Sequence, residues 1–443
     1  MEKQVRRSKK GRRSGVKRRK KIEPIYKRPE LRSGLERRSG KDRRVQFSNP
    51  ECGDDEIQEI TDVLKSGWLT TASRCSMFEK DFAKFVGVKH ALAVNSATSA
   101  LHLGLDAVGI AEGDKVLVPT FTFTATAEVV RYMKADPVFV DCDLETFCIT
   151  PTIIENILAN DQSLITDNSL KAIIPVHFGG HACDMNSILE LCKDNNLKII
   201  EDAAHALPTK YNGRMIGTIG DITCFSFYAN KTITTGEGGM LCTNDDNIAR
   251  RVKIMRLHGI NRDVWDRFSN GASWEYDIVA PGFKYNMPDI NAAMGIHQLR
   301  KAELFQEKRQ RIAEAYYESL RDIPGLILPK INCAMEDHSW YLFNVLIEPD
   351  KTLGGINRDE FINEMTRRNI GTSVHYKPIH RMTYYRERYE LKPEMFPNAE
   401  WVYQRCVCLP IFSAMTDEEV DYVIQNIREL MLISFTSNAK TYI

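Results

Sequence analysis

The sequence predicts an α/β protein with a large domain built on a mostly parallel sheet, followed by a smaller α+β domain. Two observations support this fold class. From about residue 47, short runs of β-branched residues alternate with amphipathic helical patterns, which is how the strands and crossover helices of a parallel sheet appear in a sequence. The chain also has 443 residues, enough to bury the core of a large two-domain protein.

The expected strands and helices follow one another in order through the large domain. Each strand is a short apolar run, and each helix is longer with interleaved polar residues. We expect strands at 91–94, 115–118, 137–140, 172–176 and 198–200, and helices at 96–108, 124–133, 151–158 and 185–194. Sheets of this kind bind ligands at the carboxyl ends of their strands, so the residues that follow these strands are the first candidates for a site.

A long helix over about 287–320 is expected to lead from the large domain into the small one. The small domain then has a strand pattern at 340–347 and helical patterns at 358–369 and 417–432. We therefore predict three parts. They are a basic tail at 1–45, a large domain at 46–300 and a small C-terminal domain at 301–443.

The first 45 residues differ sharply in charge from the remainder. They hold 20 Lys and Arg against 5 Asp and Glu, whereas the other residues hold 40 against 54. An Arg-Ser-Gly motif recurs, starting at residues 13, 32 and 38, and apolar side chains are few, so we expect disorder in isolation. The simplest interpretation is a solvated tail, and the alternatives are contact with an anionic surface or with the acidic remainder of the chain. Nucleic acid is not expected, because Tyr26 is the only aromatic residue there for base stacking.

The cysteines and the hydropathy pattern place the protein in a reducing, aqueous compartment. The eleven cysteines include no C-x-x-C pair, and Cys406 and Cys408 have no His cluster beside them. This favours free thiols over disulfides or zinc ligands, and no metal site is predicted. No 18-residue apolar run and no secretory leader pattern occur, so we expect a cytoplasmic protein without a transmembrane segment.

Lys231 is the most informative residue of the chain. It follows the aromatic run 225–228 at the end of an expected strand, and a glycine cluster at 236–239 comes soon after. Asp202 ends another expected strand. A lysine that can bind an aldehyde, together with a carboxylate that keeps a pyridinium nitrogen protonated, is the pair that a pyridoxal phosphate (PLP) enzyme needs. Taken singly, Lys231 could be a surface lysine and Asp202 a turn cap.

A phosphate site is expected where the first strand runs into its helix. Residues 95–102 place small hydroxyl side chains at the helix start, where the hydroxyl groups of Thr98 or Ser99 and the backbone N–H groups can bind an anion. Such residues are more often simple helix caps. Ser226, five residues before Lys231, is a further phosphate ligand candidate, and His205 could lie beside the cofactor ring or be structural.

Five motifs in one order along the chain resemble the DegT/DnrJ/EryC1/StrS sugar aminotransferases. They are Asn95–His102, Pro119–Phe123, Glu201–His205, Ser226–Lys231 and Gly236–Gly239. The resemblance extends over about 47–432. Three further segments, 175–180, 258–267 and 281–289, are most similar to the branch that aminates 4-keto UDP-sugars, which includes the UDP-4-amino-4-deoxy-L-arabinose aminotransferase of lipid A modification.

This resemblance implies a fold type I PLP enzyme that acts as a homodimer with active sites at the subunit interface. In the matching motifs, Lys231 would bind the cofactor aldehyde and carry the 1,3-proton transfer, and Asp202 would pair with the pyridine nitrogen. Phe123 would stack on the ring, with His205 packed near it. The residues that would hold the phosphate are Thr98, Ser99 and Ser226.

The resemblance also implies roles for three residues from later in the chain. Asn286 would reach the phosphate of the other subunit's cofactor, and His375 and Tyr285 would face the sugar nucleotide. Two features depart from the family pattern. Phe123 stands where the arabinose enzyme has a tryptophan, and the basic tail has no counterpart in the family core.

A lysine at position 231 also indicates which reaction the family fold performs, since relatives with a histidine there are dehydratases. We expect amino transfer from L-glutamate to the keto carbon, at C4, of a nucleotide-linked sugar for cell-surface polysaccharide or lipid A type glycans, with 2-oxoglutarate released. The alternatives are a 3-keto-sugar aminotransferase and a non-catalytic PLP-fold regulator tethered by the tail. A nicotinamide dehydrogenase is disfavoured, because no G-x-G-x-x-G follows the first strand.

Overall fold

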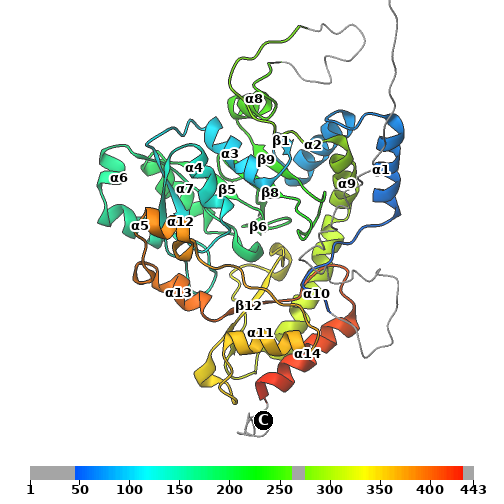
Figure 1. Cartoon of the computed structure of the whole chain (residues 1–443), viewed down its shortest axis with the longest axis vertical. Coiled ribbons are helices and arrows are strands. Elements are labelled where there is room, and N and C mark those ends of the chain that lie inside the picture. Colours follow the sequence, from blue (N-terminus) through cyan, green and yellow to red (C-terminus); the bar gives the residue numbers. More distant parts are fainter. Residues whose placement is uncertain (1–44, 262–274, 433–443) are drawn as a thin grey trace, which may run out of the picture. The chain divides into compact units, whose positions relative to one another are not determined.

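The computed structural model describes residues 45–261 and 275–432 (Figure 1). The Arg-Ser-Gly repeats, all of the predicted tail except Val45, and Trp265 of one family motif lie outside the described residues. The division of the folded part into two domains near residue 300 stays a prediction.

A seven-stranded sheet is the centre of the larger part of the fold. Its strands lie in the order β1-β9-β8-β5-β4-β2-β3, and only β9 runs antiparallel to its neighbours. The bounds are β1 (His90–Val94), β2 (Lys115–Pro119), β3 (Asp136–Val140), β4 (Leu170–Ile173), β5 (Lys198–Asp202), β8 (Ile222–Ser226) and β9 (Gly239–Thr243). The predicted mostly parallel sheet is confirmed. The fourth strand is shorter than expected because Pro175 has no N–H to extend the ladder.

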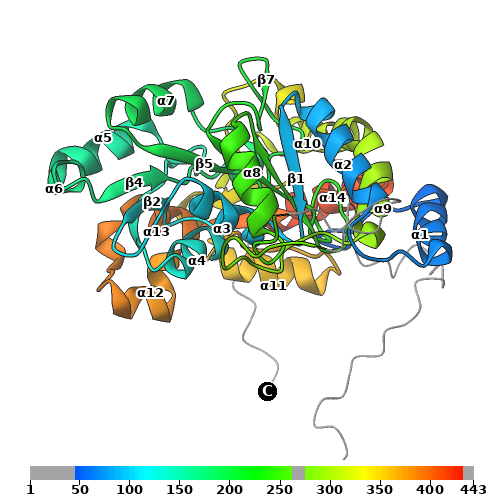
Figure 2. The ribbon, with the colours of Figure 1, turned by 90° about the horizontal axis from the view of Figure 1, so that it is seen from above.

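Helices cover both faces of this sheet, as Figure 2 shows for α3, α4 and α8 on one face and α5 and α7 on the other. This burial on both sides explains why the strands are continuous apolar runs rather than alternating ones. The bounds in this part of the chain are α1 (Asp54–Ser66), α2 (Ser73–Val86), α3 (Ala97–Ala107), α4 (Ala125–Tyr132), α5 (Pro151–Asn160), α6 (Ser163–Thr166), α7 (Met185–Asp194) and α8 (Asp246–Met255). A two-stranded ribbon, β6 (Lys210–Tyr211) with β7 (Arg214–Met215), lies between β5 and β8 in the chain.

The sheet brings the predicted site residues to one edge. Asp202 is the last residue of β5 and Ser226 the last of β8, and these two strands are parallel neighbours. β1 ends at Val94, and its helix α3 begins two residues after Asn95 with Ser96 as the cap. Because the carboxyl ends of parallel strands meet at the same edge, residues far apart in sequence face one cavity.

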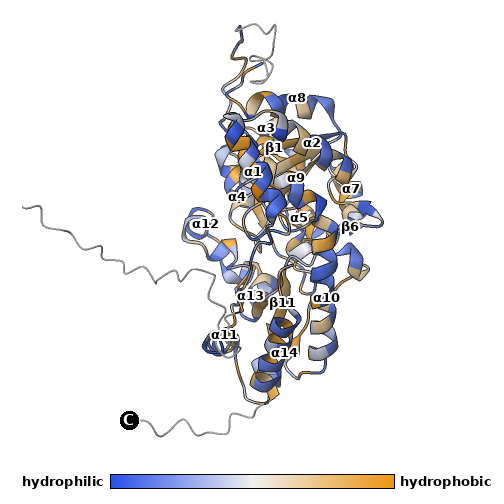
Figure 3. Cartoon of the chain, turned by 90° about the vertical axis from the view of Figure 1, so that its right-hand side faces the viewer, coloured by the Kyte–Doolittle hydropathy of each residue, from blue (hydrophilic) through white to orange (hydrophobic). Residues whose placement is uncertain are grey.

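The C-terminal part is built on a second, antiparallel sheet in the order β10-β11-β12. Its elements are β10 (Leu326–Ile327), β11 (Phe343–Ile347), β12 (Cys406–Leu409), α11 (Arg358–Arg367), α12 (Thr383–Arg388), α13 (Pro397–Tyr403) and α14 (Asp417–Leu432). The last helix has the bounds that its sequence pattern predicts. Figure 3 shows hydrophilic and hydrophobic faces side by side on α14, and the apolar face joins a core that includes Trp340, Phe343 and Phe361.

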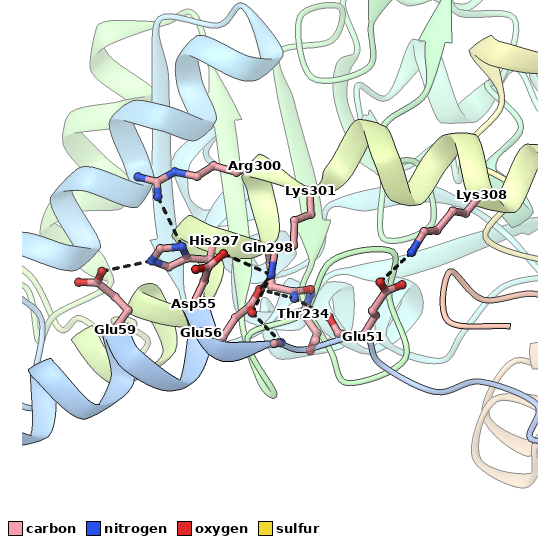
Figure 4. Close-up of polar contacts among 11 residues, drawn as sticks. Glu51, Asp55, Glu56, Glu59, Thr234, His297, Gln298, Arg300, Lys301 and Lys308 are labelled. Carbon is pink, nitrogen blue, oxygen red and sulfur yellow. Dashed lines mark hydrogen bonds and ion pairs between the residues drawn. The ribbon is translucent and has the colours of Figure 1, made fainter. Parts of the chain in front are cut away.

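The single long helix expected over 287–320 is in fact two helices, α9 (Asp289–Arg300) and α10 (Ala302–Leu320). Lys301 interrupts them with backbone angles of φ −98° and ψ −2°, and its N–H bonds to Gln298 only three residues back. The side chain of Lys301 lies 2.8 Å from both carboxylate oxygens of Glu56 on α1, and Gln298 donates to the same carboxylate at 2.9 Å (Figure 4). These contacts with Glu56 thus hold the chain against α1 at the point where α9 ends and α10 begins.

Among residues 45–261 and 275–432, none of the helices combines the length and hydropathy that a membrane crossing requires. The same residues contain no cluster of three His, Cys, Asp or Glu side chains able to hold a metal ion. All eleven cysteines are free thiols.

Candidate active site

A cavity of about 430 Å³ opens at the carboxyl edge of the seven-stranded sheet. Seven of the predicted site residues line it: Thr98, Phe123, Asp202, His205, Ser226, Lys231 and His375. They come from the start of α3, the loop after β2, the ends of β5 and β8 with the turns that follow them, and the segment between α11 (Arg358–Arg367) and α12 (Thr383–Arg388). The fold therefore brings together residues separated by more than 270 positions.

Lys231 lies in a turn after β8 rather than at the strand end that the sequence pattern predicts. The strand stops at Ser226, and the Lys231 N–H closes the turn by bonding to the Tyr228 carbonyl at 3.0 Å. Its Nζ lies 4.2 Å from the centre of the Tyr341 ring. Desolvation lowers the pKa of Lys231 to about 7, against a weaker opposing effect of the Asp202 carboxylate. A substantial fraction of the amine is therefore neutral, and able to act as nucleophile and base, near neutral pH.

Asp202 is buried at the end of β5 and held by two hydrogen bonds. The Thr126 hydroxyl donates to Oδ2 at 2.8 Å, and the Ala204 N–H donates to Oδ1 at 3.1 Å. Burial raises the pKa of Asp202, while these two bonds and the nearby Lys231 act in the opposite direction. A buried carboxylate fixed in this way is suited to a cationic N–H partner bound in the cavity.

The start of α3 has the geometry of an anion site. The Ser96 hydroxyl accepts from the Ser99 N–H at 3.1 Å, which leaves the first two helical amides, those of Ala97 and Thr98, without an intrahelical partner. A side chain on Gly239 would place its Cβ 2.5 Å from the Ser96 carbonyl carbon, so only glycine lets β9 pack this closely against the helix start.

Ser99 takes a different position from Thr98. Its hydroxyl donates to the Asn95 side chain at 2.6 Å, and it does not line the cavity. In this chain Ser99 therefore strengthens the cap of α3, and its role as a direct phosphate ligand stays a prediction.

His205 lies among aromatic rings that the sequence did not point to. Its Nδ1 accepts from the Gly179 N–H at 3.2 Å, so Nε2 carries the hydrogen and donates to the Tyr376 hydroxyl oxygen at 2.9 Å. Tyr341 stacks on the His205 ring with centroids 4.3 Å apart. Burial holds the pKa of His205 well below its usual range, and the nearby Lys231 acts in the same direction, so the ring is neutral.

His375 and Phe123 lie at the side of the cavity formed by the C-terminal part of the chain. The Nδ1 of His375 lies 3.1 Å from Cys408 Sγ, and Phe47 stacks on the ring with centroids 5.6 Å apart. Phe123 is 55% exposed and its ring centre is 5.8 Å from that of Tyr376, which leaves one face free for a planar ligand. The expected stacking role of Phe123 remains a prediction consistent with this exposure.

Two predicted residues, Asn286 and Tyr285, do not line the cavity of the described chain. Asn286 donates to the Thr71 hydroxyl at 2.6 Å and accepts from Lys284 at 2.5 Å. The Tyr285 hydroxyl lies 3.1 Å from His102 Nδ1. A role for Asn286 toward a second subunit, and for Tyr285 toward substrate, stays a prediction.

The sequence reasoning missed a buried pair behind Asp202. His177 Nδ1 accepts from the Cys183 N–H, so Nε2 donates to Glu201 at 2.8 Å, and both side chains are fully buried. The other Glu201 oxygen accepts from the Gly220 N–H and the Thr223 hydroxyl, each at 2.7 Å. Glu201 is the neighbour of Asp202 on β5, so this network fixes the strand end that presents Asp202 to the cavity.

The sequence model of the DegT/DnrJ/EryC1/StrS aminotransferase family matches residues 50–428. The chain belongs to this family. It is 47% identical over 382 residues to an uncharacterised protein of Methanocaldococcus jannaschii, covering 86% of this chain and 96% of that protein. It is 43% identical over 388 residues to the spore coat polysaccharide biosynthesis protein SpsC of Bacillus subtilis, covering 87% and 96%.

A solved structure of the same family has the same fold. This is the PLP form of Spr1654 from Streptococcus pneumoniae, titled a sugar aminotransferase, with 30% identity and a TM-score of 0.78, covering 88% of this chain and 99% of that one. The predicted α/β aminotransferase fold is therefore confirmed, as is the prediction of an aminotransferase that uses PLP.

The residues of the cavity fit this DegT-family cofactor. Lys231 would supply the amine for the aldehyde, the buried Asp202 would supply a carboxylate for the ring nitrogen, and the start of α3 would offer the amides of Ala97 and Thr98 to the phosphate. Thr98 and Ser226 line the same cavity and add hydroxyl donors to that end.

Proposed function

We propose that this enzyme transfers an amino group from L-glutamate to the C4 keto carbon of a nucleotide-linked sugar used for cell-surface polysaccharide or a lipid A type glycan. The observation that carries the catalytic part is a Lys231 with a pKa of about 7 facing a buried Asp202 in one cavity. The names of SpsC and Spr1654, a polysaccharide biosynthesis protein and a sugar aminotransferase, support the substrate class.

PLP supplies the electron sink when it is bound. In the proposed reaction, the neutral amine of Lys231 removes the proton from the carbon on one side of the reacting nitrogen. It then returns the proton to the carbon on the other side of that nitrogen. This happens first with glutamate and then with the keto-sugar. Asp202, which is fixed by hydrogen bonds from Thr126 and Ala204, would hold a proton on the ring nitrogen of the bound cofactor. Thr98 and Ser226 hold the phosphate end, so that the reacting atoms stay within reach of Lys231.

The cavity wall that carries His205, Tyr341 and Tyr376 suits an uncharged acceptor group rich in hydroxyls. His205 is neutral, and the neighbouring Tyr341 and Tyr376 offer flat apolar faces with polar tips. Such a surface suits a sugar ring, which presents hydroxyl groups at its edge and C–H groups on its face.

The test is a screen of 4-keto and 3-keto UDP- and dTDP-sugars with L-glutamate, following 2-oxoglutarate release and the site of amination by NMR of the product. We expect turnover with at least one 4-keto nucleotide-sugar. Turnover restricted to 3-keto sugars would move the amination site, and glutamate conversion with no sugar acceptor at all would refute the sugar assignment.

We further propose a homodimer in which Asn286 reaches the phosphate bound by the partner. Mixing Lys231→Ala subunits with Asn286→Ala subunits tests this, because mixed dimers then contain one intact site. Activity should recover to about a quarter of the wild-type level if subunits exchange at random. If Asn286 acts within its own subunit, mixing two inactive proteins would restore nothing.

The cytoplasm is the compartment we propose, since all eleven cysteines are free thiols. For the basic tail we propose contact with an anionic surface. Deleting residues 1–44 should leave turnover unchanged and remove binding to vesicles that contain anionic lipid. A large loss of kcat would instead assign the tail to the active site.

A further inference from the structure

A chain of three polar side chains leads from the cavity wall into the C-terminal sheet. His375 Nδ1 lies 3.1 Å from Cys408 Sγ, and Cys408 Sγ in turn is hydrogen-bonded to Asn344 Oδ1. Asn344 on β11 and Cys408 on β12 are directly paired in the antiparallel register. Both residues are buried, at 4% and 0% exposure, so the hydrogen bonds between these side chains are shielded from water.

The donor and acceptor roles of these three side chains follow from Asn344, the residue farthest from the cavity. The Asn344 carbonyl oxygen can only accept, so the Cys408 S–H donates to it. The sulfur is then left as an acceptor, and the Nδ1 of His375 must carry the hydrogen that points at it. A neutral imidazole holds one hydrogen, so Nε2 has a free lone pair. Because Nδ1 faces Cys408, Nε2 is the ring nitrogen left for the cavity that His375 lines.

The adjacent residue offers the opposite polarity. The hydroxyl oxygen of Tyr376 accepts from His205 Nε2 at 2.9 Å, which leaves the phenolic hydrogen of Tyr376 to donate elsewhere. The rings of His375 and Tyr376 are neighbours with centroids 4.8 Å apart, and both residues line the cavity. One acceptor and one donor therefore stand side by side on this wall.

We propose that Cys408, held by Asn344, is a positioning residue that keeps His375 as a hydrogen-bond acceptor, and that His375 and Tyr376 together select a keto-sugar with a free hydroxyl next to the ketone. The ketone oxygen accepts from Tyr376, and the adjacent hydroxyl donates to His375. This inference rests on the proposed function for its substrate class, but the state of the His375 ring does not depend on that function.

The charges around His375 favour the same neutral state. Burial lowers the pKa of His375 to about 4, and the positive charge of Lys231 adds to this. The other titratable groups near the ring are His205, which is itself neutral, the phenol of Tyr376, and the thiols of Cys408 and Cys406, whose pKa values burial raises. The ring is thus surrounded by neutral groups and the partly protonated Lys231, and it stays unprotonated throughout the neutral range.

The first experiment reads the ring directly in the PLP-loaded full-length enzyme. Histidine labelled with ¹⁵N, with the His375 signals assigned by their loss in His375→Gln, should show a protonated Nδ1 and an unprotonated Nε2. Cys408→Ser keeps both an acceptor and a donor and should preserve this pattern. Cys408→Ala should shift the signals toward the other tautomer, whereas Cys406→Ala should not.

Cys406 is a matched control because it is on the same strand, on the same side two residues earlier, and equally buried, with its sulfur 4.0 Å from the His375 backbone carbonyl rather than beside the ring. Both alanine variants remove the same side-chain volume, and urea unfolding of each measures its folding cost. A wild-type enzyme with hydrogen on Nε2, or a Cys406→Ala variant that changes the ring as much as Cys408→Ala, would overturn the proposal.

The second experiment tests the substrate class with two probes, UDP-4-keto-6-deoxyglucose and its 3-deoxy analogue. Cys408→Ala should raise the KM for the hydroxylated sugar by about two- to tenfold with little change in kcat, the size expected for one hydrogen bond. The glutamate half-reaction should be unchanged. With the 3-deoxy sugar, wild type and Cys408→Ala should have the same KM, and an equal penalty with both sugars would refute the link to the hydroxyl.

The proposed function and the role of Cys408 can be refuted separately. If the wild-type enzyme aminates no keto-sugar, the proposed function is wrong, while the ¹⁵N pattern still decides the role of Cys408. If the wild-type enzyme aminates the sugar and Cys408→Ala behaves like Cys406→Ala, the proposed function stands and this inference is wrong.

Discussion

The active-site cavity has two walls of different electrostatic character. The wall formed by the seven-stranded sheet carries the titratable pair Lys231 and Asp202, in which burial lowers the pKa of Lys231 to about 7 and raises the pKa of Asp202. The wall formed with the C-terminal segment carries His205, His375 and Tyr376, which are neutral and joined to buried partners by hydrogen bonds. The first wall can move protons, whereas the second can only offer fixed donors and acceptors.

This difference separates chemistry from recognition. Groups whose pKa lies near the working pH can change protonation state within a catalytic cycle. Groups whose pKa is far from it keep one state and can distinguish ligands by polarity. Changes on the sheet wall should therefore lower kcat by large factors, and changes on the other wall should raise the KM for the sugar by small ones.

The largest effect is expected from Lys231→Ala. Without this amine no group in the cavity replaces the proton carrier, so turnover should fall by at least about 10⁴-fold. The measurement is 2-oxoglutarate release with saturating glutamate and acceptor. Lys193→Ala, at an exposed position on α7, is the control and should keep full activity. Substantial turnover by the Lys231 variant would break the assignment of the charged wall.

A smaller loss is expected from Asp202→Asn. The amide keeps the shape of the side chain, but it removes the negative charge that would stabilise a protonated ring nitrogen, and its single oxygen replaces only one of the two oxygens that accept from Thr126 and Ala204. We expect kcat to fall by about 10²–10³-fold with PLP still bound. Asp194→Asn, at an exposed site, controls for the loss of one negative charge. If activity were retained within a factor of two, Asp202 would be a structural acid only.

The lowered pKa of Lys231 also predicts how the stability of the cofactor-free protein depends on pH. From about pH 7, its folded value, to its usual 10.5, the unfolded chain binds a proton at Lys231 that the folded chain does not. Stability from this group therefore rises with pH across that window, by up to about 1.4 kcal/mol per pH unit, and it is lost as the pH falls from 10.5 to about 7.

This is measured by urea unfolding at several pH values between 7 and 9, comparing wild type with Lys231→Met. In the variant, the free energy of unfolding should rise less with pH, because methionine fills the same space without titrating. Titrating groups whose pKa Lys231 does not affect, including the buried cysteines, contribute equally to both proteins and cancel in the difference, whereas Asp202, His205 and His375 are coupled to Lys231 and belong to the effect that is measured. If the free energy of unfolding changed equally with pH in both proteins, the folded protein would hold Lys231 protonated, contrary to the effect expected from desolvation.

The two walls also differ in how far the sequence predicted them. Lys231, Asp202 and Thr98 follow strands in a recognisable pattern, and each lines the cavity. Tyr341 and Tyr376 were missed because they meet His205 from 136 and 171 positions away, a distance that no local pattern encodes. Tyr376 did have one signal, since it follows the predicted His375 directly.

Local patterns also predicted which helices and strands form better than they predicted the residues at which these begin and end. The last helix was placed at its observed bounds, but the break at Lys301 was not foreseen, because no glycine or proline marks it and its anchor, Glu56, is 245 residues away. The turn that carries Lys231 was assigned to a strand for a related reason. An apolar run continues through Phe227 and Tyr228, although the ladder with β9 ends at Ser226.

The smallest effect is expected from Tyr376→Phe, which sharpens the contrast between the walls. The change removes one hydroxyl and keeps the ring that packs against His205 and Phe123. Since the hydroxyl is a fixed donor to the sugar, the KM for the keto-sugar should rise by about two- to tenfold, while kcat and the glutamate half-reaction stay near wild type. Tyr384→Phe, with a ring 55% exposed, is the control and should change neither constant. A loss of kcat as large as that of Asp202→Asn would mean that Tyr376 takes part in proton transfer, and the division between a reactive wall and a recognising wall would fail.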